Sequence, residues 1–104
     1  MDRRRERMGD NKLTFECNAV MDIAAVADLK TQLQALLAEE GAIVLDGESV
    51  ERIDGAALQL LASFYREASR LGTPPRWQAA SEALTQAVAL LGLSKHLGLD
   101  DNRG

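Results

Sequence analysis

The side chains that can do acid–base or nucleophilic chemistry are few in this sequence. Asp46 and Asp54 lie near the ends of strand-like segments, and a pair of carboxylates can act as general acid and general base. The same residues also suit a turn and a helix start. His96 is the only histidine and lies in a short C-terminal segment, so it is a poor partner for a nucleophilic serine. We therefore predict a non-catalytic protein with no catalytic residue.

Cofactor and metal motifs are absent from the sequence as well. Neither GxxxxGK[ST] nor GxGxxG occurs, and these are the loops that cradle nucleotide phosphates. One cysteine, Cys17, and one histidine do not make a zinc site by themselves. The net charge of −4 does not favour a nucleic-acid backbone, and the basic run at residues 2–7 is typical of a solvated tail. We predict no cofactor, no metal and no nucleic-acid partner.

The same features bear on compartment and domain organisation. A single cysteine allows no disulfide framework, which fits a reducing cytosol. The sequence contains no run of eighteen apolar residues, so we expect no membrane span. No apolar region follows the first arginines, so we expect no secretory leader. The length of 104 residues predicts one domain. We expect a cytoplasmic domain at residues 11–100, between a disordered tail at 1–10 and a short tail at 101–104.

Alternating strands and helices must position these side chains. Polar–apolar alternation and short apolar runs predict strands at residues 12–17, 42–46 and 76–80, with residues 18–23 continuing the first strand or forming another. Apolar residues at helical spacing predict helices at about residues 24–40, 55–71 and 81–91, the last with a stripe of Leu84, Val88 and Leu91. Residues 93–99 suggest one more turn. The order predicts a small α/β layer with parallel pairings.

Asp54 and Gly55 stand where a strand region meets the longest predicted helix. Asp-Gly is typical of a hairpin turn, but the helix follows at once, which favours a strand-to-helix junction. Asp54 would cap the helix by accepting from its free amides, and Gly55 would let other groups approach the backbone. Spacing alone leaves two interpretations: a capped turn without function, which it favours, or a docking point for a partner or a phosphate.

Three stretches together resemble the STAS family, the fold of the anti-sigma factor antagonists. They are VERIDGAALQLLASFYREASRLG at residues 50–72, MDIAAVADLKTQL at 21–33 and SEALTQAVALLGLSKHL at 81–97. The resemblance covers about residues 12–100. It implies a four- to five-stranded mixed sheet with three or four helices mainly on one face. Members are generally not enzymes but bind partners around an Asp-Ser or Asp-Thr motif, whose serine a kinase phosphorylates in the sigma-regulating branch.

This chain departs from the family at the phosphoacceptor. Gly55 occupies that position and has no hydroxyl, and Ser49 and Ser63 do not align with it. The resemblance therefore implies a module that docks a signalling partner of an anti-sigma, chemotaxis or two-component system without the serine switch. The candidate contacts are Asp54, Gly55, Ala56, Gln59, Leu60 and Ser63. Counted from the core stripe at Ala57, we expect Ala56, Gln59 and Ser63 to point outward and Leu60 to lie at the border.

Other interpretations remain beside this one. The chain also resembles the STAS subunit of a phospholipid-trafficking ABC transporter, which would clamp on an ATPase, although that subunit keeps a threonine where Gly55 sits. Small-ligand sensing would need an enclosed pocket, for which no convergent polar cluster is visible. A homodimer would use an exposed sheet face or edge strand, and we expect Leu13 and Phe15 to lie on such a face.

Overall fold

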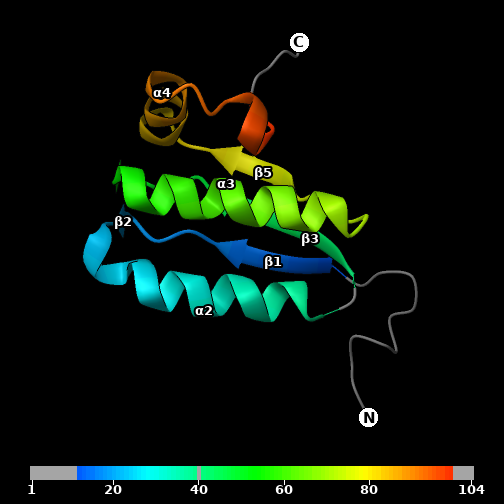
Figure 1. The fold of residues 1–104 in the computed structure, drawn as a ribbon. Helices are drawn as coiled ribbons and strands as arrows, with labels where there is room; N and C mark the ends of the chain where they lie inside the picture. Colours follow the sequence, from blue (N-terminus) through cyan, green and yellow to red (C-terminus); the bar gives the residue numbers. More distant parts are fainter. Residues whose placement is uncertain (1–11, 40, 100–104) are drawn as a thin grey trace.

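The computed structural model describes residues 12–39 and 41–99, which form alternating strands and helices (Figure 1). The predicted tails lie outside these residues. The elements in chain order are β1 (Lys12–Glu16), β2 (Val20–Met21), the 3-10 turn η1 (Ile23–Ala25), α2 (Val26–Leu37), β3 (Ala42–Gly47), β4 (Arg52–Ile53), α3 (Gly55–Arg70), β5 (Arg76–Ala80), α4 (Glu82–Leu90) and the 3-10 turn η2 (Lys95–Leu97). The predicted α/β class is confirmed.

The strands form two small parallel sheets. Three of them pair in the order β1-β3-β5, and β2 pairs with β4. The apolar run of β3 therefore lies in the centre, as a continuous apolar strand should, and β5 lies at an edge, as its preceding proline favours. Each pairing among the described strands is parallel, so the strands of each sheet end at one edge of that sheet.

Helices α2 and α3 lie side by side along the larger sheet, and α4 lies beyond β5 (Figure 1). The core between them is aliphatic, and its most deeply buried side chains are Leu45, Leu58, Leu61, Leu84, Leu97, Val50 and Val88. The expectation that Leu13 and Phe15 lie on an open sheet face is wrong. Leu13 pairs with Ile43 and Phe15 with Leu45, so both side chains lie on the face that packs into the core, where Leu13 is buried and Phe15 half-buried.

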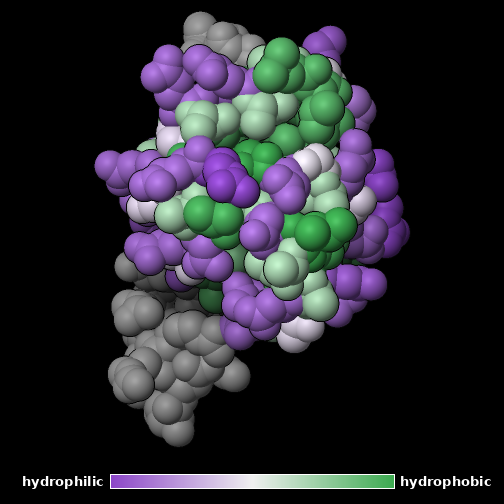
Figure 2. All heavy atoms as spheres, turned by 90° about the vertical axis from the view of Figure 1, so that its left-hand side faces the viewer, coloured by the Kyte–Doolittle hydropathy of each residue, from purple (hydrophilic) through white to green (hydrophobic). Residues whose placement is uncertain are grey.

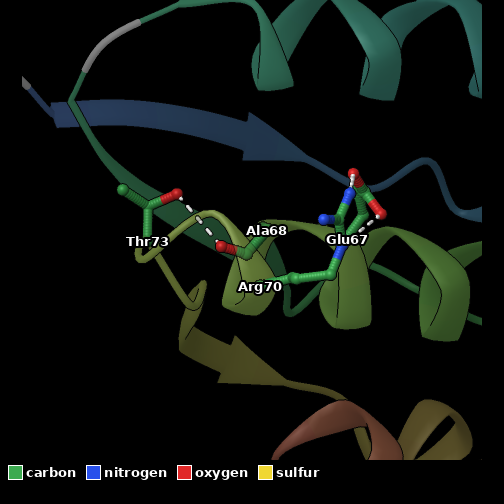
Figure 3. Close-up of polar contacts among 4 residues, drawn as sticks. All are labelled: Glu67, Ala68, Arg70 and Thr73. Atoms are coloured by element: carbon green, nitrogen blue, oxygen red, sulfur yellow. Dashed lines mark hydrogen bonds and ion pairs between the residues drawn. The ribbon is translucent and has the colours of Figure 1, made fainter.

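The ends of the helices follow the local sequence. Ser81 caps α4: its Oγ accepts from the Leu84 amide at 3.1 Å and donates to the Val50 carbonyl at 2.6 Å. At the far end of α3, Thr73 donates through its hydroxyl and its amide to the Ala68 carbonyl (Figure 3). These bonds take up backbone groups that a helix end leaves free, at the start of α4 and at the end of α3.

Candidate functional site: the surface around the start of α3

Asp54 occupies the N-cap position of α3 in extended conformation. Its amide donates to the Met21 carbonyl at 2.9 Å, and its carbonyl accepts from the Leu58 amide at 3.0 Å. Its side chain makes no capping bond to α3. The prediction that the Asp54 carboxylate accepts from the free amides of this helix is therefore wrong. Instead Asp54 Oδ2 accepts from the amide of Ile23, the first residue of η1, at 3.2 Å.

The pairing of β2 with β4 explains this change of partner. Met21 lies opposite Ile53, so the chain leaving β2 passes the start of α3 and brings a free η1 amide within reach of the carboxylate. Asp22, the N-cap residue of η1, makes no side-chain cap bond either. The Asp54 carboxylate thus ties η1 to α3 and holds two helix starts side by side.

Gly55 is exposed and begins α3. Its backbone does not adopt a positive φ, and a Cβ built on it would meet only Leu91 Cδ1, at 3.8 Å, which is ordinary van der Waals contact. The fold therefore has room for a side chain at this position. Neither the backbone nor the packing requires glycine here, so the fold does not explain why this position lacks a hydroxyl.

The other predicted contacts follow along α3. Ala56, Gln59 and Ser63 are exposed and Leu60 is half-buried, in agreement with the helical spacing. The six candidates nevertheless lie on two parts of the surface. Leu60 and Ser63 line a groove of about 180 Å³ between α3 and α2, and the other four candidates do not border it. The groove is bordered by Lys30, Leu33, Gln34, Leu37, Leu60, Ser63, Phe64 and Glu67.

Sequence reasoning missed three large apolar side chains that are exposed on η1 and at the end of α4. Ile23 is 72% exposed, Leu90 is 86% exposed and Leu91 is 50% exposed. Ile23 carries the amide bound by Asp54, and Leu91 is the neighbour of Gly55. The stripe Leu84, Val88 and Leu91 predicts burial of Leu91, but α4 ends at Leu90 and the chain turns there. The one sequence signal was the pair of adjacent leucines at the end of the predicted helix, next to Gly92.

Figure 2 views this end of the molecule. Hydrophobic side chains gather in its upper part, where α4 lies, and in separate places below, among hydrophilic ones. We call Ile23, Leu90 and Leu91 together the apolar patch.

The side chains that could act as nucleophile, acid, base or metal ligand do not come together in an active centre. Burial, and secondarily the charge of Asp46, raise the pKa of the Cys17 thiol to about 12, so the thiolate nucleophile is absent near neutral pH. Asp46 Oδ1 accepts from the Glu48 amide at 3.1 Å in a turn, and His96 is exposed on η2. Within residues 12–39 and 41–99, no three His, Cys, Asp or Glu side chains gather in a way that could hold a metal ion.

The same described residues include no helix long and apolar enough to cross a membrane. A hollow beside Phe15 and Met21 has a volume of about 20 Å³, which suits one water molecule rather than a metabolite. Polar side chains do converge on this hollow, namely Asn18, Asp22, Asp28 and Gln32, but its volume is too small for a metabolite. The groove between α2 and α3 is larger, but its exposed lining is mainly apolar.

Comparison with known proteins defines the class of this domain. The family model described as "Mlab, STAS domain" matches residues 5–99. The chain therefore belongs to this STAS family. STAS domains mediate protein–protein interactions and are generally non-catalytic, so the domain is a regulatory or interaction module.

A solved structure shares the fold. It is the crystal structure of a sulfate transporter family protein from Wolinella succinogenes, with a TM-score of 0.70 and 22% sequence identity over 88% of this chain and 73% of that chain. At this identity the likeness concerns the fold alone. A comparison with functionally curated proteins gives no match.

Proposed function

We propose that this chain is a cytoplasmic module that docks a signalling partner through the Asp54-Gly55 loop and the first half of α3, without the serine phospho-switch. The partner would be a kinase, an anti-sigma factor or a chemotaxis protein. The observation that carries the proposal is the surface around Gly55. Leu91 is exposed beside this helix start, whose first residue has no side chain, and Ile23 and Leu90 are exposed on η1 and α4. Exposed apolar side chains rimmed by polar ones are typical of interaction sites.

The absent switch rests on the chemistry of residue 55. Phosphorylation needs a hydroxyl, and none is present at the position where STAS relatives carry it. Ser63 borders the groove between α2 and α3, eight residues beyond Gly55 along α3. Ser49 lies in the exposed turn after β3. A kinase partner would therefore bind this chain without releasing it by phosphate transfer to residue 55.

Two substitutions on α3 test the docking surface. Ala56→Arg and Gln59→Glu change exposed positions and should leave the fold intact, so each is expected to weaken capture of the partner from the native organism by at least about tenfold. Ser69→Arg, an exposed position near the other end of α3, is the matched control and should capture normally. Unchanged capture by both test variants, with circular dichroism spectra like that of the parent chain, would contradict the proposal.

Intact-mass measurement tests the missing switch. The purified chain is incubated with ATP and each captured kinase, and no stoichiometric addition of phosphate is expected. A full phosphate on the parent chain would overturn this part of the proposal, and fragmentation would tell whether Ser49 or Ser63 received it.

A second candidate is a subunit clamped on the ATPase of an ABC-type phospholipid transporter. The description of the matching family, "Mlab, STAS domain", favours it. It predicts stable co-purification with a nucleotide-binding protein and poor solubility of the chain when it is purified alone. A well-behaved soluble chain that captures a signalling protein instead would exclude this candidate.

A further inference from the structure

The apolar patch lies at the end of the molecule where the strands terminate. Asp54 binds the Ile23 amide, and Leu91 adjoins Gly55, so η1, α3 and α4 meet there. Figure 1 shows these elements together at one end of the sheet, with the start of α3 between them. The residues of the patch therefore come from η1 and from the end of α4, on either side of the start of α3.

The end of the molecule that carries the patch is acidic. The segments at this end are residues 16–22, 46–54 and 81–82, and they hold seven of the ten carboxylates in the described part of the chain. These are Glu16, Asp22, Asp46, Glu48, Glu51, Asp54 and Glu82. Arg52 is the one basic residue among them, against seven lysines and arginines across all described residues. Within the described residues, none of these seven carboxylates takes part in an ion pair.

We infer that the apolar patch binds a short amphipathic segment of a protein partner, with two or three large apolar side chains flanked by lysine or arginine. The inference rests on the proposed docking function and names the chemistry of its partner. Apolar side chains of the segment would cover Ile23, Leu90 and Leu91. The flanking cations would meet carboxylates that have no ion-pair partner among the described residues, since complementary charge steers association and selects among partners.

The negative charge also selects against other occupants. Nucleic acids and anionic membrane surfaces carry the same sign as this end of the molecule and are repelled by it. An acidic amphipathic helix would cover the apolar residues equally well but would place like charges together. A basic amphipathic segment is the occupant for which both the apolar and the charged groups find partners.

Synthetic peptides test this chemistry directly. Three fluorescent helical peptides share one leucine face and differ only in their flanks, which carry Lys and Arg, Gln, or Glu. Anisotropy with the full chain should show that the Lys and Arg peptide binds at least about tenfold tighter than the Gln peptide at low salt. The Glu peptide should bind most weakly. The preference should fall as salt rises, because ions screen exposed charges.

Variants locate the binding site. Leu90→Ser combined with Leu91→Ser should weaken binding of the basic peptide by about tenfold or more. Glu48→Gln combined with Glu51→Gln should reduce the preference for basic flanks. Leu71→Ser is the matched control, because Leu71 is 54% exposed just beyond the other end of α3, and it should change nothing. Equal binding of the three peptides, or equal loss with Leu71→Ser, would overturn the inference.

Two further outcomes separate this inference from the proposed function. If capture of the native partner depends on Ala56 and Gln59 but is unchanged by salt and by the double leucine variant, the docking function stands and this inference fails. If the basic peptide binds the patch while capture ignores Ala56 and Gln59, the inference stands and the proposed surface fails. A chain that dimerises through the patch, so that Leu90→Ser with Leu91→Ser yields monomers in sedimentation, would also overturn it.

Discussion

Replacing Gly55 by alanine asks whether the fold requires glycine at the start of α3. The backbone there has no positive φ, and the new Cβ would touch only Leu91 Cδ1, at 3.8 Å. Alanine also has fewer unfolded conformations and a better helix propensity. We therefore expect Gly55→Ala to stabilise the protein by about 0.5 kcal/mol, the lower end for such changes because the position lies in the first turn.

Gly98 provides the contrasting case in the same chain. Its φ is +69°, a conformation that costs an alanine about 1–2 kcal/mol. Its Cβ would also lie 2.8 Å from Tyr65 Cζ, with the Tyr65 hydroxyl closer still. Gly98→Ala should therefore destabilise the protein by at least about 1 kcal/mol, so the two glycine substitutions are expected to have opposite signs.

Urea unfolding measures both changes. Trp77 is the only tryptophan and its Nε1 donates to the Leu97 carbonyl at 2.7 Å, so its fluorescence reports on the packing of η2 against β5. In thermal unfolding the stabilisation by Gly55→Ala corresponds to a rise in Tm of about 2–4 °C for a domain of this size. If Gly55→Ala lowers stability by 1 kcal/mol, the fold needs glycine at this position, and our reasoning about the missing hydroxyl fails.

The remaining predictions concern the core and its one thiol. Leu84→Ala should lower the free energy of unfolding by about 2–5 kcal/mol, because Leu84 is fully buried, whereas Leu90→Ala should change it by less than about 0.5 kcal/mol; equal effects in urea titrations would contradict the packing. Trp77→Phe should cost about 1 kcal/mol through the unpaired Leu97 carbonyl, and an unchanged midpoint would mean that water replaces the indole. Cys17 should resist a thiol reagent at pH 8 in the native state and react after unfolding. Because its pKa is raised from 9.0 to about 12, the unfolded state releases the proton first and stability should fall between these values. Cys17→Ala should flatten that slope, and an equally steep slope in the variant would assign it to other groups.

The elements were largely predictable from local pattern. The pattern at residues 42–46, 76–80 and 81–91 gave the right element in each case, since alternation, apolar runs and helical spacing depend on neighbours in the sequence. The two-stranded sheet was less predictable. Strands β2 and β4 have two residues each, too few for a periodic signal, and their pairing joins segments about thirty residues apart.

The candidate site was predicted in its centre and missed in its surroundings. Helical spacing correctly placed Ala56, Gln59 and Ser63 on the surface. It could not show that η1 and α4 lie beside Gly55, because those contacts form only when β2 pairs with β4 and α4 packs beyond β5. The same limitation explains the wrong partner assigned to Asp54 and the wrong face assigned to Leu13.

The sequence by itself determined the alternating elements, the family resemblance and the absence of a hydroxyl at residue 55, because each is a property of residue types in order. Only the tertiary structure decided which groups meet. In the folded chain the Asp54 carboxylate accepts from the Ile23 amide, and Leu90 and Leu91 are exposed to solvent. Seven carboxylates lie at the end of the molecule where α3 begins. The reason is geometric: parallel strands end at a common edge, so loops distant in sequence share one surface there.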